Sequence, residues 1–130
     1  MVLDTSAVIA ILLDEPEADR MVKAVDAARL RRLSAASLLE AGIVIQSRLG
    51  TAGEEELDLL LNRMQVETMA ITEEHANLAR SAYRRFGKGR HPAALNYGDC
   101  FSYALAAALQ EPLMFKGNDF GHTDIIVAAY

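Results

Sequence analysis

Cysteine is almost absent from this chain of 130 residues, and its scarcity excludes the class of small disulfide-stabilised proteins. A single cysteine, Cys100, cannot build a disulfide framework within the chain, so a reducing compartment is the simple expectation. Three scattered histidines do not supply the ligand spacing of a zinc site. We therefore expect neither disulfides nor zinc to stabilise the fold, and we expect Cys100 to pack as a small apolar side chain.

Long apolar runs are also missing. No segment approaches the roughly 20 apolar residues that a membrane-spanning helix needs. The first residues have neither the basic region nor the apolar stretch of a signal peptide. The sequence thus predicts a cytoplasmic protein that does not associate with a membrane. Its 52% hydrophobic and 24% charged residues are typical of a globular chain long enough to bury its own core.

Basic residues are outnumbered by acidic ones, 13 against 18, and the net charge of −5 is unfavourable for non-specific binding of nucleic acid. The basic residues are nevertheless concentrated, because no acid occurs between His75 and Gly98. The candidate polyanion-binding residues in that stretch are Arg80, Arg84, Arg85, Lys88, Arg90 and His91. They form either such a binding surface or simply a solvated helix face.

Short apolar segments alternate with longer amphipathic ones along the chain. Strands are expected at residues 1–3, 30–35, 66–71, 113–115 and 124–128. Helices are expected at residues 7–13, 15–28, 36–49, 53–64, 72–86 and 99–109. We expect Ser6 to cap the first helix and Gly50 to end the third. This alternation predicts a single α/β domain over residues 1–130, with three α/β/α layers and a mostly parallel central sheet.

Four carboxylates fall at strand ends or helix starts in this arrangement: Asp4, Glu40, Asp99 and Asp119. Ligands of open parallel sheets bind beyond the carboxyl ends of the strands. Several carboxylates in one pocket repel one another unless a divalent cation neutralises them. Because all-oxygen ligation suits Mg²⁺ or Mn²⁺, the sequence predicts a metal site built from these four residues.

Each carboxylate also has a purely structural explanation. Glu40 is the only charge in the apolar segment 38–45, which indicates a helix that is buried or packed between subunits. A carboxylate there must be protonated, paired or bound to a cation, but Glu40 could also close a capping box with Ser37. A helix cap explains Asp4 or Asp99, and a turn explains Asp119. The residues alone leave these alternatives open.

Four segments that carry these acids, in the same order, resemble the PIN-domain ribonucleases and, within them, the VapC toxins of bacterial toxin–antitoxin pairs. The segments are MVLDTSAVIA at 1–10, SAASLLE at 34–40, LNYGDCFSYALA at 95–106 and FKGNDF at 115–120. Order, spacing and length all fit, so the resemblance covers essentially the whole chain. The fourth segment has Gly117 and Asn118 where many members have a threonine-rich stretch.

The resemblance implies an endoribonuclease that depends on Mg²⁺ or Mn²⁺, forms a homodimer and is inhibited by a VapB-type antitoxin. Asp4, Glu40 and Asp99 would hold the principal metal ion, and Asp119 would assist them. Ser6 would position a carboxylate or a substrate phosphate, and the basic stretch would bind the RNA backbone. Two alternatives remain within this family: an RNA-binding module without catalysis, and a nuclease of RNA processing that is not a toxin.

Aspartate-based phosphoryl-transfer domains are the rival class of enzyme. A phosphatase of the haloacid-dehalogenase type needs a second aspartate two positions after the first, and Ser6 stands there. A receiver domain carries its acceptor aspartate at the end of the third strand, where this chain has Ile71 and Thr72. Both readings are therefore disfavoured.

Overall fold

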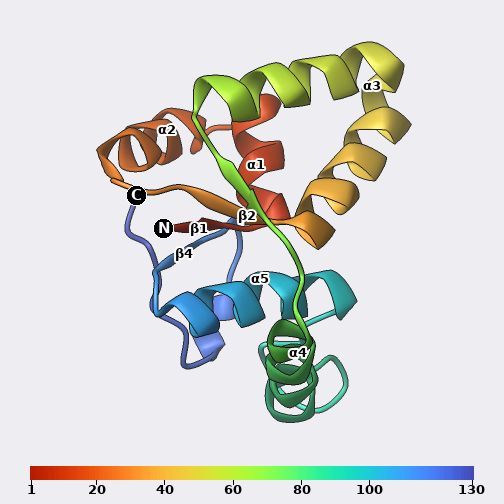
Figure 1. The fold of residues 1–130 in the computed structure, drawn as a ribbon, viewed down its shortest axis with the longest axis vertical. Helices are drawn as coiled ribbons and strands as arrows, with labels where there is room; N and C mark the ends of the chain where they lie inside the picture. Colours follow the sequence, from red (N-terminus) through yellow and green to blue (C-terminus); the bar gives the residue numbers. More distant parts are fainter.

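The computed structural model describes all 130 residues, and its helices and strands alternate along the chain (Figure 1). The strands are β1 (Val2–Leu3), β2 (Arg32–Ser34), β3 (Glu67–Met69) and β4 (Leu113–Met114). The helices are α1 (Thr5–Leu12), α2 (Ala18–Ala27), α3 (Ala35–Arg63), α4 (Glu73–Phe86) and α5 (Tyr97–Leu109), with a short 3₁₀ helix at Phe120–His122. None of the helices combines the length and the apolar character needed to cross a bilayer.

The four strands form one parallel sheet in the order β3-β2-β1-β4. The fifth strand expected at 124–128 is wrong as a strand: only one parallel bridge, between Leu113 and Val127, forms there. The chain before this bridge is held by side chains instead, because Asp124 accepts hydrogen bonds from Arg85 and Tyr103. Because the strands are parallel, the carboxyl ends of β1, β2 and β4 lie at the same edge of the sheet.

Side chains that alternate along each strand divide the core between the two faces of the sheet. Leu3 and Met114 pack with α1, α2 and α3, whereas Val2 and Leu113 pack with α4 and α5. Figure 1 shows α1 to α3 on one side of the sheet and α4 and α5 on the other. The predicted three-layer α/β/α architecture with a parallel sheet is confirmed.

Helix starts differ from the expected ones in ways that affect the acidic residues. Helix α1 begins at Thr5 and not at residue 7, because Asp4 and not Ser6 is its N-cap. Helix α5 begins at Tyr97, with Asn96 as its N-cap. Gly50 interrupts α3 as expected, but helix resumes at once, and its φ of 68° and ψ of −161° belong to a region that favours glycine.

Arg31 ties the covering helices of one layer together. Its guanidinium donates from Nε to the Val25 carbonyl at 2.8 Å, and from its two terminal nitrogens to the Asp26 and Met64 carbonyls, each at 3.0 Å. Those carbonyls lie at the ends of α2 and α3, where carbonyls lack the regular hydrogen-bond partner of a helix interior. One side chain thus satisfies helix-terminal acceptors next to the start of β2.

Candidate active site

Asp4 lies at the carboxyl end of β1 and is 4% exposed. Its Oδ2 accepts hydrogen bonds from the backbone N–H and the hydroxyl of Ser6, at 2.8 and 2.5 Å. Its Oδ1 accepts one from the Ser102 hydroxyl at 2.6 Å. The capping role considered for Asp4 is therefore real, while the expected capping by Ser6 is wrong. Both oxygens of Asp4 are fixed in direction by hydroxyl groups.

Glu40 lies in the second turn of α3, and the capping box considered for it does not form. The N-cap of α3 is Ser34, whose hydroxyl accepts the Ala36 N–H, so Ser37 is already inside the helix. Glu40 Oε2 instead accepts a hydrogen bond from the Thr5 hydroxyl at 2.5 Å. This bond joins the start of α1 to α3 and turns the carboxylate toward Asp4's end of the sheet.

Gly98 gives the Glu40 carboxylate its place beside α5. A Cβ at position 98 would lie only 2.5 Å from Glu40 Oε1 and 2.8 Å from Oε2, which is closer than any real contact. The absence of a side chain at Gly98 therefore allows Glu40 to approach the residue just before Asp99. Helices α3 and α5, which are distant in sequence, therefore contact each other where Glu40 lies against the backbone of Gly98.

Asp99 occupies the first turn of α5, where it closes a capping box with Asn96. Its Oδ2 accepts the Asn96 N–H at 2.8 Å, and the Asn96 side chain accepts the Asp99 N–H at 2.9 Å. Burial raises the pKa of Asp99 to about 6, against the lowering effect of the Asn96 hydrogen bond. The charges of Asp4, Asp119 and Glu40 raise this pKa further.

Asp119 sits in the loop after β4 and is the exposed member of the group. Its side chain makes no capping hydrogen bond to the 3₁₀ helix that follows, so the structural role considered for it is not seen. The loop itself is anchored on both sides. Phe120 is buried against Phe115, with ring centroids 5.1 Å apart, and the Lys116 N–H donates to the Ser6 hydroxyl at 3.0 Å.

The four carboxylates share one end of the sheet without a neutralising side chain, because none of the ion pairs in the structure involves them. Lys116, the nearest basic residue in sequence to Asp119, pairs with Glu15 and with Glu17, the latter at 2.9 Å. An all-oxygen set with mutual repulsion fits a hard divalent cation. No three His, Cys, Asp or Glu side chains are gathered closely enough to form a ready-made metal cage.

Intramolecular hydrogen bonds account for that open arrangement. The Asp4, Glu40 and Asp99 oxygens described above point to hydroxyls and a backbone N–H rather than to one common centre. The donors to Asp4 and Glu40 include two residues that the sequence reasoning missed, Thr5 and Ser102. Ser102 also contacts Ser37, with 3.1 Å between the hydroxyl oxygens. Ser102 follows Asp99 by three positions on the same helix face, but this spacing does not indicate a partner on the distant strand β1.

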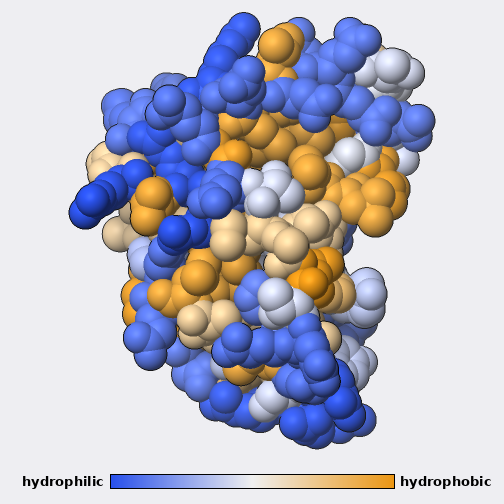
Figure 2. Space-filling view, viewed as in Figure 1, coloured by the Kyte–Doolittle hydropathy of each residue, from blue (hydrophilic) through white to orange (hydrophobic).

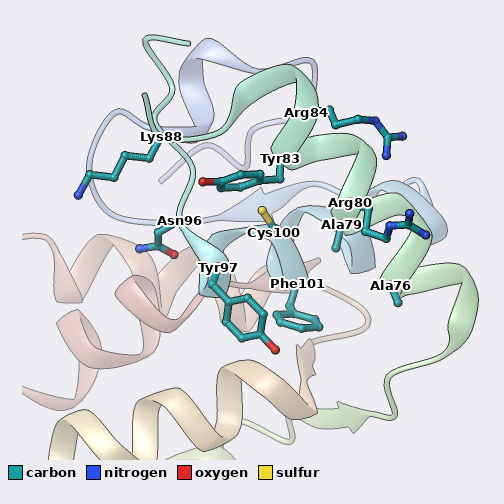
Figure 3. A pocket seen from close by; sticks show the side chains of 10 residues that line it. All are labelled: Ala76, Ala79, Arg80, Tyr83, Arg84, Lys88, Asn96, Tyr97, Cys100 and Phe101. Carbon is teal, nitrogen blue, oxygen red and sulfur yellow. The ribbon is translucent and has the colours of Figure 1, made fainter. Parts of the chain in front are cut away.

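The basic stretch is divided by the structure into three environments. Arg80, Arg84 and Lys88 line a pocket between α4 and α5 (Figure 3). Arg85 forms an ion pair with Asp124 at 2.6 Å, and this hydrogen bond raises the pKa of Arg85 above its usual value. Arg90 lies over the Tyr83 ring, 5.9 Å from its centroid, which is within the roughly 6 Å reach of a cation–π contact.

His75 and His91 both act as local backbone acceptors. His75 closes the capping box of α4 with Thr72. His91 Nδ1 accepts the Ala93 N–H at 3.1 Å, and its ring packs edge-on against Phe86 at 5.2 Å. Cys100 is buried, as expected, and burial raises the pKa of its thiol to about 11.

Comparisons with known proteins identify the family of this chain. The family model of the PIN domain matches residues 1–126. The ribonuclease VapC30 of Mycobacterium tuberculosis is 54% identical over 129 residues, which cover 99% of this chain and 98% of the relative. A ribonuclease VapC of Mycolicibacterium smegmatis is 55% identical over 125 residues, covering 96% of this chain and 97% of the relative. The chain therefore belongs to the PIN-domain family and, within it, to the VapC ribonucleases.

Solved structures show the same fold at much lower sequence identity. The VapC20 toxin of Mycobacterium tuberculosis, described as cleaving the sarcin-ricin loop, matches with a TM-score of 0.78 and 15% identity, over 96% of this chain and 95% of that one. A toxin–antitoxin complex from Klebsiella pneumoniae matches with a TM-score of 0.76 and 15% identity, over 99% and 97% of the two chains. The predictions of family and fold class are confirmed.

Proposed function

We propose that this chain is a Mg²⁺- or Mn²⁺-dependent endoribonuclease that acts in the cytoplasm as the toxin of a type II toxin–antitoxin pair. The observation that carries the proposal is the cluster of carboxylates at one end of the sheet, held in place by hydroxyl groups and lacking any cationic partner. The curated relatives, which share more than half of its residues, are named ribonucleases.

Asp4, Glu40 and Asp99 are the residues that would hold the metal ion, with Asp119 approaching from its exposed loop. The ion would supply a more acidic bound water and stabilisation of the developing negative charge in phosphodiester cleavage. The chain's hydroxyl groups have a separate task. Ser102 and Ser6 hydrogen-bond the two oxygens of Asp4, and Thr5 hydrogen-bonds one oxygen of Glu40, so these side chains are held in place before any substrate arrives.

Ser6 links two parts of the proposed site. Its hydroxyl donates to Asp4 Oδ2 and accepts the Lys116 N–H, so it couples β1 to the loop that carries Asp119. The hydrogen bond from Ser6 to Asp4 supports a role in positioning that carboxylate, and a role toward a substrate phosphate stays a prediction. Arg80, Arg84 and Lys88 face outward from the neighbouring pocket, and we propose that they bind the RNA backbone.

The proposal is tested by cleavage of structured RNA with the purified chain. Cleavage should require Mg²⁺ or Mn²⁺ and stop in EDTA, and Asp4→Asn should abolish it while circular dichroism reports an intact fold. Equal cleavage in EDTA would overturn the metal mechanism. Failure to bind Mn²⁺ in calorimetry, together with intact RNA affinity, would instead indicate a binding module without catalysis.

An antitoxin partner follows from the same charge pattern. A cleft lined by carboxylates attracts a basic peptide, so an Arg or Lys side chain of a VapB-type protein would neutralise the cluster and block the site. Coexpression with the product of the adjacent small gene tests this. Copurification that is lost on Glu40→Gln or at high salt supports it, whereas the absence of any complex removes the toxin assignment and leaves a nuclease of RNA processing.

A homodimer is supported by apolar side chains on the outer face of α3. Leu39 and Ile43 lie one turn apart, flank Glu40 and are 65% and 58% exposed. Apolar surface is visible along this arm of α3 at the right of Figure 2. A second copy packed on this face would bury apolar side chains that remain exposed in the single chain. Sedimentation of Ile43→Glu tests it: a dimer that becomes a monomer supports the proposal, and an unchanged mass rejects this face.

A further inference from the structure

A pocket of about 770 Å³ lies between α4 and α5, outside the group of carboxylates. Its volume falls within the range of small-ligand sites, roughly 300–1,000 Å³. The inner lining is mainly apolar and includes Ala79, Tyr83, Cys100 and Phe101. Figure 3 shows the Tyr83 ring and the Cys100 sulfur facing each other across its middle, with Tyr97 and Phe101 below them. The pocket therefore offers flat aromatic surface around an apolar floor.

The rim of this pocket has one sign of charge. Arg80, Arg84 and Lys88 line it, and no acidic residue does. A ligand that complements both the aromatic lining and the basic rim needs a flat apolar portion and a nearby anion. A nucleotide within a single strand has this combination, because every base presents a π-face and every linkage carries a phosphate. Charge complementarity thus favours RNA over an uncharged apolar partner.

The pocket and the carboxylate group both include residues from the start of α5. Asn96 lines the pocket and exchanges two hydrogen bonds with Asp99. Tyr97 and Cys100, which also line it, are separated from Asp99 by one residue and by none. Tyr97 is 80% exposed, and its ring packs edge-on against Phe101 with centroids 5.0 Å apart. A large aromatic ring held at the surface in this way is available for a further partner.

We propose that the α4–α5 pocket binds a base of single-stranded RNA next to the bond that is cleaved. The base would stack on Tyr83 or Tyr97, and Arg80, Arg84 and Lys88 would neutralise the adjoining phosphates. This inference rests on the proposed ribonuclease function and adds a site that selects unpaired substrate. A paired base cannot leave its helix to enter such a pocket without losing its own stacking.

Binding of a short, dye-labelled single-stranded RNA in EDTA tests the pocket without relying on cleavage. Loss of one stacked base weakens binding roughly tenfold. We therefore expect Tyr83→Ala and Tyr97→Ala to bind about ten times more weakly than the unaltered chain, and Tyr83→Phe to bind normally. An oligomer of abasic ribose phosphates should bind the unaltered chain weakly and should no longer distinguish it from Tyr83→Ala. Tyr97→Ala guards against misfolding, because its side chain is mostly outside the core.

The rim is tested by comparing Arg84→Ala with Arg48→Ala, which removes an exposed arginine from α3. The first should lower the salt dependence of RNA binding by about one phosphate contact, and the second should not. Normal RNA binding by both tyrosine variants would overturn the pocket inference while leaving the nuclease proposal intact. A shift of Tyr83→Ala from dimer to monomer would overturn it in favour of a second copy as occupant. Absence of cleavage by the unaltered chain with either Mg²⁺ or Mn²⁺ would instead contradict the proposed function.

Discussion

The carboxylates at the two ends of the parallel sheet differ in whether they have cationic partners. At the amino end, Glu111 lies between two cations: it accepts a hydrogen bond from the Met1 amine at 2.7 Å and pairs with Arg32. At the carboxyl end, Asp4, Glu40 and Asp99 lie together with no basic partner. Both groups are at least half-buried, so the difference is one of charge balance and not of exposure.

The pKa values follow that balance. Burial opposes the charge of Glu111, yet hydrogen bonds from the amine and from Arg32 hold its pKa below the usual value. At the other end, burial and three like charges raise the pKa of Asp99 to about 6. The amino end is therefore arranged for stability, whereas the carboxyl end stores repulsion that a cation or a cationic peptide can relieve. Four substitutions separate these two roles.

Gly98→Ala should have the largest effect, and on activity alone. The added Cβ would displace the Glu40 carboxylate, whose flexible side chain can move away at little cost in stability. A shift of about 1 Å in a catalytic group can lower a rate about a hundredfold, and we expect a loss of that size in RNA cleavage. Gly121→Ala is the matched control, because its added Cβ would meet nothing within 4 Å. Undiminished cleavage by Gly98→Ala would separate Glu40 from the reaction.

Glu111→Gln should do the reverse, lowering stability without changing cleavage at saturating metal. We expect a loss of about 2 kcal/mol in the free energy of unfolding, measured with urea at neutral pH. Because the pKa of Glu111 is lowered in the folded protein, its contribution is present above pH 4.5 and lost as pH falls through the lowered pKa. Glu56→Gln, at an exposed position without an ion pair, is the control. Equal loss in both variants at every pH would contradict the assignment.

Ser102→Ala should reduce cleavage about tenfold by freeing one oxygen of Asp4. The side chain is fully buried, so the variant also needs a measurement that packing alone would not change. Metal affinity provides it: Mn²⁺ binding in calorimetry should weaken in Ser102→Ala, and Ser102→Thr should restore part of it. Ser47→Ala removes an exposed hydroxyl from α3 and should leave both measurements unchanged.

Asp99→Asn should give the smallest effect on folding, and it should be stabilising. Asparagine can still accept the Asn96 N–H, but it carries no charge against Asp4, Glu40 and Asp119. The folded protein resists ionisation of Asp99, so at pH 7 without metal we expect a gain of about 1 kcal/mol. The gain should vanish below about pH 4, where Asp99 is protonated whether folded or not. A melting temperature of Asp99→Asn below that of the unaltered chain at pH 7 would show that repulsion among these carboxylates does not destabilise the fold.

The sequence by itself determined the architecture and the candidate carboxylates. Alternating short apolar strands and longer helices predicted a parallel three-layer fold, because side-chain periodicity depends only on local geometry. Glu40 stood out as the one charge in the apolar segment 38–45. The family resemblance was confirmed by the comparisons. The metal and the catalytic roles of the four acids stay predictions.

Tertiary structure decided everything that depends on partners distant in the chain. The capping box of Ser37 and Glu40 was equally consistent with the residues, and only the start of α3 at Ala35 removed it. Thr5 and Ser102 have ordinary sequence surroundings, yet they hold Glu40 and Asp4 across 35 and 98 positions of chain. Hydrogen bonds between remote segments leave no periodic trace in a single sequence. The sequence therefore predicts which carboxylates form the site, whereas only the fold specifies which hydroxyl groups hold them and that no cationic side chain pairs with them.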